Sequence, residues 1–374
     1  MKKLALRCLL LGLTLGLTGC QTIGYYAQAI NGQRQILSRQ KSIASLLEDP
    51  ATPDALKEQL RFVLEIRAFA EKQLALPANG HYLNYADLGR RFAVWNVHAA
   101  PAFSLKPKSW WYPVVGRLNY RGYFSEQRAR RYAARLQRQG YDVYVGGVVA
   151  YSTLGWFRDP VLNTFVNEQE TELAELLFHE LAHQRLFVAG DTDFNEAFAT
   201  AVAEEGMRRW LHSRNDPAAT RKYEAEIGRT EQFVRVVSRA RAKLQALYAE
   251  PGPSDALASR SNPGEDHSAA DLRHAKQLIL DELRRDYERL KADRGGREDY
   301  DQWFRQPLNN AQLNTVETYY RLVPAFRQLI QQHRGDLEQF YEATRALGKL
   351  SKTERHLRLD GFSNAQRGDG NEGG

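Results

Sequence analysis

Cysteine is almost absent from this sequence. Only Cys8 and Cys20 occur in 374 residues, and both lie in an N-terminal segment that we expect to be cleaved or lipidated. The rest of the chain then has no pair of cysteines for an internal disulfide. Its stability must come from burial of apolar side chains, with a bound metal as the other available support. With 43% apolar and 11% aromatic residues, the chain is far too apolar for a disordered protein.

A concentrated positive charge is also missing. The formal net charge is +7, and loss of Lys2, Lys3 and Arg7 with the N-terminal segment leaves 49 Lys and Arg against 45 Asp and Glu, or +4. These basic residues are spread along the chain, and no basic stripe interleaved with aromatic residues occurs. Nucleic acid is therefore not expected as a partner. The length suffices for one large domain or two modest ones.

Residues 1–20 have the architecture of a bacterial lipoprotein signal peptide. After the positively charged start, Leu9–Leu17 form an apolar core that is too short to span a bilayer comfortably. The segment ends in the lipobox Leu-Thr-Gly-Cys, whose Cys20 thiol receives the diacylglycerol. An ordinary secretory signal or an anchor helix is the alternative. Position 21 is Gln rather than Asp, which resembles lipoproteins sorted to the outer membrane. We therefore expect a lipid anchor on Cys20, in the outer membrane and facing the periplasm.

Beyond the signal segment we predict an α+β fold that is mostly α-helical. Apolar residues recur at helical spacing over residues 22–49 and again over 52–76, with Pro50 and Pro53 between them. These two helices are expected to form an antiparallel pair. Residues 21–80 would then make an N-terminal helical pair that follows the lipid anchor.

Residues 81–160 differ in composition, and we predict a small mixed α/β region there. β-Branched and aromatic residues predict strands at 92–97, 114–120 and 142–151, with a helix over 125–139. Residues 161–350 are predicted to be helical, apart from a flexible, Pro/Gly-rich insertion over 250–268. Residues 351–374 end in Gly, Asn and Asp and are expected to be a disordered tail.

His179, Glu180 and His183 form an HExxH motif within the predicted helix 172–187. Residues i and i+4 share one face of a helix, so the two imidazoles project to the same side, a spacing that fits two positions of a tetrahedral zinc site. Glu180 lies between them in sequence and is angled to reach a water in the open coordination position. The motif therefore predicts one zinc ion per chain.

A catalytic zinc needs a third protein ligand, and Glu196 is the candidate. It lies near the start of the next predicted helix, after a turn that contains Gly190 and lets the two helices pack antiparallel. Glu196 would then face the two histidines. An HExxH helix followed by a helix with Asn-Glu near its start resembles thermolysin-like gluzincins.

The alternative is that the two histidines hydrogen-bond within a helix bundle, while Glu180 lies on a solvated face. Glu204 and Glu205 are candidates to orient a zinc-bound histidine, or are simply exposed. Gluzincins often have an Asp four residues after the ligand Glu, and this chain has Thr200 there. The residue that orients the histidines is therefore unassigned.

The ligand set implies a hydrolytic mechanism. Zinc lowers the pKa of its bound water, and Glu180 takes the proton as the water attacks a scissile peptide carbonyl. The oxyanion needs a further donor, for which Tyr319 and Tyr320 on a late helix are candidates. The alternative is that both tyrosines are packing residues.

Zincins also hold the substrate backbone against an exposed strand edge. The strand upstream of the motif helix is the best candidate, with Gly147, Val148, Ala150 and Tyr151 as substrate-binding residues. Glycine there would permit close backbone approach. An interior strand with a bulge is the alternative.

Several segments together resemble a family of bacterial lipoproteins labelled predicted aminopeptidases. Besides the lipobox, they are Gly24–Ala29, Gly32-Gln33, Tyr120–Phe124, Ala150–Gly155, Phe178–Gln184, Asn195–Ala199 and Leu308–Ala311. The resemblance covers nearly the whole chain after the signal, except residues 250–268 and the tail. It implies a zincin-like metallopeptidase of the gluzincin type, in which a small sheet packs on a helical bundle over residues 81–350. It also implies His179, His183 and Glu196 as ligands and Glu180 as the base.

Three functions remain open at this point. The leading one is a zinc peptidase that acts on peptides or proteins in the bacterial envelope. An aminopeptidase needs a carboxylate for the substrate's free amine, and no GxMEN-type motif precedes the HExxH helix, so exopeptidase action rests on the family label. An endopeptidase is the rival within this class. A non-catalytic zincin-like lipoprotein that serves as a binding or assembly factor is the third, and intact Glu180 argues against it. The sequence identifies no protein partner.

Overall fold

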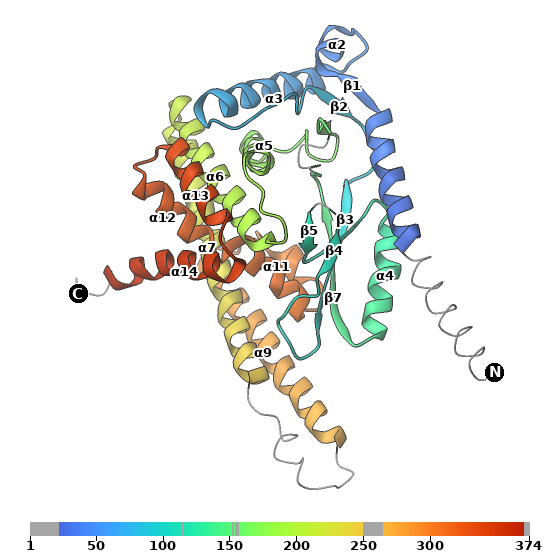
Figure 1. The fold of residues 1–374 in the computed structure, drawn as a ribbon, viewed down its shortest axis with the longest axis vertical. Coiled ribbons are helices and arrows are strands. Elements are labelled where there is room, and N and C mark those ends of the chain that lie inside the picture. Colours follow the sequence, from blue (N-terminus) through green and yellow to red (C-terminus); the bar gives the residue numbers. More distant parts are fainter. Residues whose placement is uncertain (1–21, 114, 152, 154–156, 250–264, 370–374) are drawn as a thin grey trace, which may run out of the picture.

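The computed structural model describes residues 22–113, 115–151, 153, 157–249 and 265–369. The predicted signal segment with Cys20 lies outside these residues, as does most of the predicted insertion. The described chain is mostly helical, with three small β-sheets (Figure 1), which confirms the prediction of an α+β, mainly α-helical protein. Among the described helices, none combines the length and apolarity needed to cross a bilayer.

The predicted single helix over residues 22–49 is interrupted by a strand. Residues 22–38 are helical, and the chain then becomes extended in β1 (Gln40–Ser42) before the short helix α2 (Ile43–Glu48). β1 pairs antiparallel with β2 (Asn84–Ala86), which pairs parallel with β8 (Val161–Leu162). Because partners more than 40 residues away hold β1 in the sheet, helical periodicity alone did not reveal the break.

The central sheet has the order β6-β3-β7 and is antiparallel throughout. Its strands are β3 (Val94–Pro101), β6 (Arg121–Tyr123) and β7 (Tyr141–Val148). A separate hairpin precedes β6, formed by β4 (Trp110–Tyr112) and β5 (Gly116–Leu118). The predicted strand over 114–120 is therefore a shorter hairpin arm, and the other two predicted strands correspond to β3 and β7.

Alternation along β3 gives the sheet two different faces. Trp95, Val97 and Ala99 pack against Ala129 and other apolar residues of α4 (Glu126–Arg138). The intervening residues of β3 face the opposite way, toward the helical side of the molecule. Figure 1 shows the sheet between α4 and the helices.

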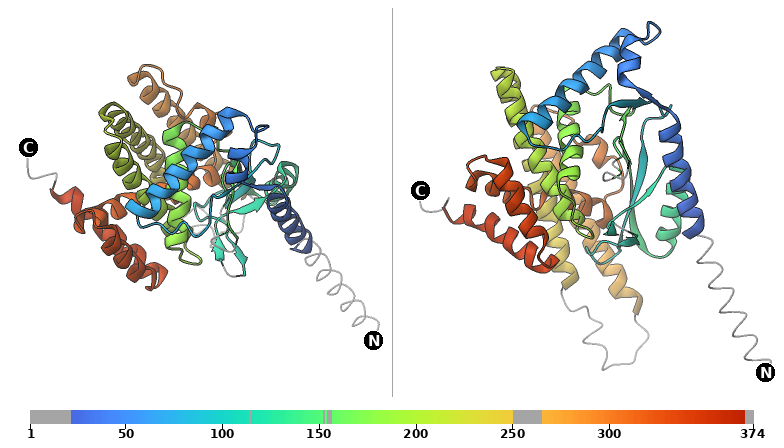
Figure 2. Two further views of the ribbon diagram at one scale, coloured as in Figure 1. Left: turned by 90° about the horizontal axis from the view of Figure 1, so that it is seen from above. Right: turned by 45° about the horizontal axis from the view of Figure 1, so that its top comes forward.

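Helix 22–38 packs at the sheet rather than against the second N-terminal helix, α3 (Asp54–Gln73). The Gln28 side chain accepts a hydrogen bond from Phe124 N at 3.0 Å and donates one to Gly122 O at 3.5 Å. Figures 1 and 2 show this helix beside α4, whereas α3 crosses the helical side. The predicted antiparallel pair is thus wrong, because the two helices bury their apolar faces against different partners.

The rest of the molecule is a helical assembly. Its helices are α5 (Glu170–Arg185), α6 (Thr192–Ser213), α7 (Pro217–Ala249), α9 (Glu265–Asp293), α10 (Asp301–Phe304), α11 (Asn310–Tyr320), α12 (Val323–Gln332), α13 (Leu337–Gly348) and α14 (Lys352–Asp369). α9 begins at Glu265, so the last residues of the predicted insertion are helical. The predicted disordered tail is wrong over residues 352–369, because α14 buries Arg355 and Leu359 against the other helices.

One hydrophobic core joins the N-terminal segment to the helices of the motif. It extends from Ile36 to Leu359 and includes the fully buried Phe178 of α5 and Phe198 of α6. α3 packs on α5, and α5 packs on α6 along its length. The HExxH helix is therefore held on several sides, which gives its side chains fixed positions.

Candidate metal centre and catalytic cavity

The HExxH motif lies in the C-terminal half of α5. A capping box closes the start of this helix, in which Gln169 and Glu172 exchange hydrogen bonds between side chain and backbone. Helical spacing then places His179 and His183 one turn apart, as predicted, with ring centroids 4.8 Å apart. Their Nε2 atoms are 3.2 Å apart, so both point at the same place.

Glu196 of α6 completes a group of three ligand atoms. Its Oε2 lies 3.4 Å from His179 Nε2 and 3.7 Å from His183 Nε2. A tetrahedral zinc with bonds of about 2.0–2.1 Å holds its ligand atoms roughly 3.3 Å apart. The three separations match that spacing, so these residues fit a zinc ion that keeps one open position. Among the described residues, these three are also the His, Cys, Asp or Glu side chains that lie close enough together to hold a metal ion.

The charges of the three groups support one another. Burial opposes ionisation of Glu196, but hydrogen bonds from His179 and His183 outweigh it and hold the pKa of Glu196 below its usual value. Burial likewise opposes protonation of His183, and the contact with Glu196 raises its pKa in spite of that. A carboxylate that stays ionised is the form required of a metal ligand.

The turn between α5 and α6 holds Glu196 in register with the histidines. The Asn195 side chain accepts from Val188 N at 2.8 Å and donates to Val188 O at 2.9 Å. Gly190 has φ = +81° and donates from its N–H to Val115 O at 3.1 Å. A Cβ on Gly116 would lie 3.0 Å from Gly190 N, so glycine is needed where the hairpin meets the turn.

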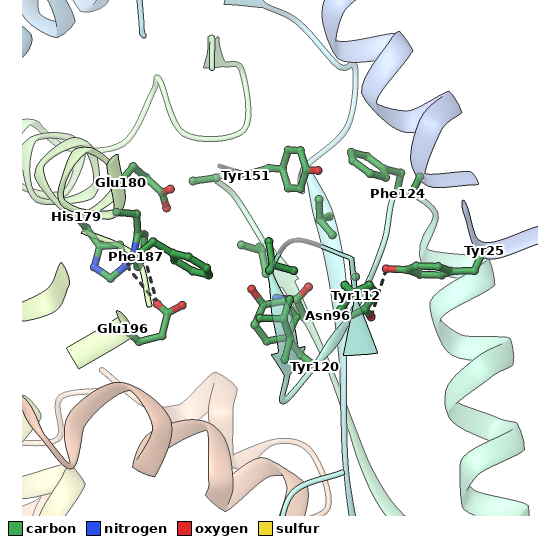
Figure 3. A pocket seen from close by; sticks show the side chains of 18 of the residues that line it. Tyr25, Asn96, Tyr112, Tyr120, Phe124, Tyr151, His179, Glu180, Phe187 and Glu196 are labelled. Carbon is green, nitrogen blue, oxygen red and sulfur yellow. Dashed lines mark hydrogen bonds and ion pairs between the residues drawn. The ribbon is translucent and has the colours of Figure 1, made fainter. Parts of the chain in front are cut away.

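Glu180 and the ligand set line a cavity of about 450 Å³. Figure 3 shows His179, Glu180 and Glu196 on one side of this cavity, and Tyr25, Tyr112 and Phe124 on the far side. Burial raises the pKa of Glu180, and the charges of Glu196 and Asp159 add to the effect of burial, while the two histidines lower it. A carboxylate beside the ligand set, with a raised pKa, suits proton transfer.

The two candidate tyrosines of α11 separate in the structure. Tyr319 lines the cavity, and the charge of Glu196 together with burial raises its pKa well above the usual value. Its hydroxyl therefore stays protonated and is available as a donor. Tyr320 does not line the cavity and packs between the main core and the cluster formed by α7, α9 and α11.

Three of the four predicted substrate-binding residues reach the cavity. Val148, Ala150 and Tyr151 line it, whereas a Cβ on Gly147 would lie 2.5 Å from the ring of Phe92 on the other face of the sheet. β7 lies at the edge of its sheet, and the described residues place no further strand beside it. An edge strand is what addition of a substrate strand requires. Such addition stays a prediction.

Several cavity residues were not found from the sequence. Tyr120 lines the cavity opposite α5, and burial and the charges of Glu196 and Glu180 raise its pKa. Asn96 also lines it, and His98 packs with its ring centroid 5.8 Å from that of Tyr120. Burial lowers the pKa of His98 to about 4, so this ring is neutral. Asn96 and His98 alternate with Trp95 and Val97 along β3. This period of two is the sequence pattern that could have shown which face of the strand they occupy.

Neither candidate for orienting the histidines does so in the structure. Both oxygens of Glu204 accept from Arg327, at 2.5 and 2.7 Å, and Glu205 pairs with Arg209. His183 Nδ1 is buried and has no hydrogen-bond partner among the described residues. Glu175, one turn before His179, accepts from the Tyr223 hydroxyl at 2.9 Å, and burial raises its pKa to about 7.

Comparison with known proteins places the chain in a family. No curated protein and no solved structure matches it, so the zincin-like architecture stays a prediction. The model of a family described as putative aminopeptidase matches residues 24–359, which is most of the chain. This confirms the family resemblance of the sequence, while the zinc, the gluzincin type and the lipid anchor stay predictions. The chain belongs to this aminopeptidase family.

Proposed function

We propose that the protein is a zinc-dependent peptidase, in which His179, His183 and Glu196 hold one zinc ion. The observation that carries this proposal is the triangle of ligand atoms, with sides of 3.2, 3.4 and 3.7 Å. Glu180 lines the same cavity, so a base lies beside the ligand set. The name of the family points to peptide bonds as the substrate.

The residues of the chain have separate roles in this reaction. When bound, zinc would lower the pKa of a water ligand and polarise the substrate carbonyl. Glu180 takes a proton from the attacking water as the water oxygen bonds to the carbonyl carbon. It then passes that proton to the amine nitrogen as the C–N bond breaks. The hydroxyl of Tyr319 donates a hydrogen bond to the carbonyl oxygen as it becomes negative.

The same proposal includes a place of action. The lipobox ending at Cys20 favours attachment to the bacterial outer membrane, on the periplasmic side, with envelope peptides or proteins as substrates. A catalytic carboxylate beside the ligands favours an enzyme over a structural zinc protein, since structural sites fill all four positions with protein ligands.

The test is substitution of the base without loss of the metal. The chain without residues 1–20 is compared with its Glu180→Gln variant, by zinc content and by mass spectrometry of a peptide library. We expect one zinc in both, and a fall in kcat of about 10²–10⁴-fold in the variant. Glu172→Gln is the control, an exposed carboxylate on the same helix whose capping box also accepts glutamine. Bound zinc without hydrolysis by the wild type would overturn the peptidase assignment.

A further inference from the structure

The cavity beside the ligand set has an aromatic far wall. Tyr25, Tyr112, Tyr120, Phe124 and Tyr151 lie on this side, on helix 22–38 and on the sheet and its loops (Figure 3). Phe187 lines the cavity near the ligands. Rings of this kind bind apolar side chains over a large contact area. A volume of about 450 Å³ falls in the range of sites that enclose a small ligand.

This wall carries no charge that could pair with a charged substrate group. The described residues that line the cavity include no Lys, Arg or Asp, and its carboxylates are Glu180 and Glu196. Its tyrosines stay neutral, since burial raises the pKa of Tyr151 to about 12 and that of Tyr112 further. An unpaired charge brought into such a cavity loses hydration without compensation.

The cavity also lacks a free carboxylate for the N-terminus of the substrate. An aminopeptidase holds the free amine with a carboxylate, but Glu196 is committed to the histidines and Glu180 to proton transfer. Asn96 is the remaining side-chain amide in the cavity, and it bears no charge. A free amine would therefore gain no ion pair with a carboxylate that is not already in use.

We propose that the substrates are peptides with a large uncharged side chain, aromatic or branched aliphatic, next to the scissile bond, and that a free N-terminus is not required. This rests on the proposed peptidase function. Burial of such a side chain favours these peptides by about tenfold or more over charged ones, which gain no apolar burial and lose hydration.

The test is a matched set of internally quenched peptides with one varied residue, Phe, Leu, Lys or Glu, each with a free or an acetylated N-terminus. The zinc-loaded chain without residues 1–20 should cleave the Phe and Leu peptides with kcat/KM at least about tenfold above the Lys and Glu peptides. Acetylation should change kcat/KM by less than about threefold. Equal cleavage of charged peptides, or dependence on a free amine, would overturn this inference and leave the peptidase intact. If no peptide is cleaved by the zinc-loaded protein, the proposed function itself fails.

A variant tests the cavity directly. Val148→Asp places a carboxylate in the wall, and kcat/KM for the Lys peptide should rise relative to the Phe peptide by about tenfold. Leu83→Asp is the control, because Leu83 is an exposed leucine that does not line the cavity. An unchanged preference in a folded Val148→Asp variant would contradict the proposal.

A second and independent observation concerns the outer face of helix 22–38. Its inner face packs on the molecule through Gln28 and Ile36, and Gly32 is needed where Phe124 approaches. Four large apolar residues are exposed on the same helix: Ile23 (70%), Tyr26 (37%), Ile30 (69%) and Leu37 (39%). Spacings of three, four and seven residues put them on a single stripe.

The position of this stripe in the chain indicates what covers it. The described part of the helix starts at Thr22, two residues after the lipobox Cys20. A diacylglycerol on Cys20 would hold the start of the helix at the bilayer, and a helix with one apolar stripe lies in the interface with that stripe toward the acyl chains. We infer that Ile23, Ile30 and Leu37 contact the lipid surface. Because Tyr26 belongs both to the stripe and to the cavity wall, the cavity would open beside the membrane.

Vesicle binding by the unlipidated chain tests this contact. The chain that begins at residue 21 is mixed with phosphatidylethanolamine–phosphatidylglycerol vesicles and sedimented, beside an Ile23→Ser, Ile30→Ser variant. We expect the variant to bind at least about tenfold more weakly. Leu278→Ser with Leu357→Ser is the matched control, since both are exposed leucines on other helices. Absence of vesicle binding by the wild type, equal binding by all variants, or a dimer that the Ile variant abolishes would each overturn the inference.

Discussion

At the level of single residues, Tyr319 and Tyr320 show how neighbouring side chains acquire different roles. They are adjacent on α11, and successive residues of a helix point about 100° apart. Tyr319 therefore reaches the cavity close to Glu196, whereas Tyr320 is packed in the core. This difference makes Tyr319 the proposed donor and Tyr320 its matched control.

We expect Tyr319→Phe to lower kcat by about 10²–10³-fold, because it removes a donor that acts mainly in the transition state. Zinc content should stay at one per chain, and KM should change little. Tyr320→Phe should alter kcat by less than about twofold. Steady-state kinetics on one cleaved peptide check both. Equal losses in the two variants would show that Tyr319 acts through packing instead.

At the level of elements, α14 holds the α5–α6 turn, which precedes Glu196, the proposed third ligand. Asp191, 1% exposed in that turn, accepts from Arg355, from Lys352 at 3.1 Å and from His356 Nε2 at 2.9 Å. Arg321 of the α11–α12 junction donates to His356 Nδ1 at 2.7 Å. These contacts connect α14, the α5–α6 turn and α11.

Arg355→Met should destabilise the protein by about 3–5 kcal/mol, since it leaves Asp191 buried with one partner fewer. Urea unfolding followed by circular dichroism measures this change. Arg358→Met on the same helix is the control, because Arg358 is exposed and pairs only with Glu354 among the described residues. That substitution should change the free energy of unfolding by no more than about 0.5 kcal/mol. A small effect of Arg355→Met would show that α14 is held by its apolar contacts alone.

The contacts of Asp191 with α14 also have a defined pH dependence. Burial raises the pKa of Asp191, but the hydrogen bond with His356 and the charge of Lys352 outweigh it, so the folded pKa lies below the usual value. As the pH falls below about 4, the Asp191 carboxyl is therefore protonated first in the unfolded state. The stability that its ionised form gives the folded state is then lost as the pH falls to the folded pKa. Between about pH 4 and pH 2 the wild type should lose more unfolding free energy than Asp191→Asn. If the free energy of unfolding fell equally steeply with pH in the two proteins, Asp191 would not have the lowered folded pKa.

At the level of the whole molecule, the proposed metal centre would join two helices of the main core. α5 carries two of the proposed ligands and α6 the third, and both helices are buried along most of their length. Binding to the folded state alone adds RT ln(1 + [Zn]/Kd) to the free energy of unfolding, about 2.7 kcal/mol at a hundredfold excess over Kd. The metal is therefore expected to stabilise the molecule as well as to act in catalysis.

Zinc added to the metal-free protein should raise Tm, and chelation should reverse the shift and abolish hydrolysis. Glu196→Ala should show no zinc-dependent rise in Tm, because one of three ligands is lost. Glu58→Ala removes an exposed carboxylate elsewhere and should keep the full shift. Differential scanning fluorimetry against zinc concentration measures both. A shift that persists in Glu196→Ala would place the metal at another site.

Local patterns determined much of this protein from the sequence alone. The spacing of His179 and His183 on one helix, and the choice of Glu196 as their partner, depend on short stretches of chain and agree with the geometry found. The helices of residues 161–350 and the strands β3 and β7 are also visible as periodicity. These features follow from the backbone geometry of single elements, so few long-range contacts were needed to predict them.

Only the tertiary structure decided the features that depend on distant contacts. β1 interrupts a helical pattern because β2 pairs with it, and α14 orders a polar tail because Asp191 accepts from Arg355. The choice between the tyrosines of α11, and the aromatic wall shared by helix 22–38 and the sheet, depend on how elements pack. Packing energy comes from residues far apart in the chain, and a local pattern carries no record of those neighbours.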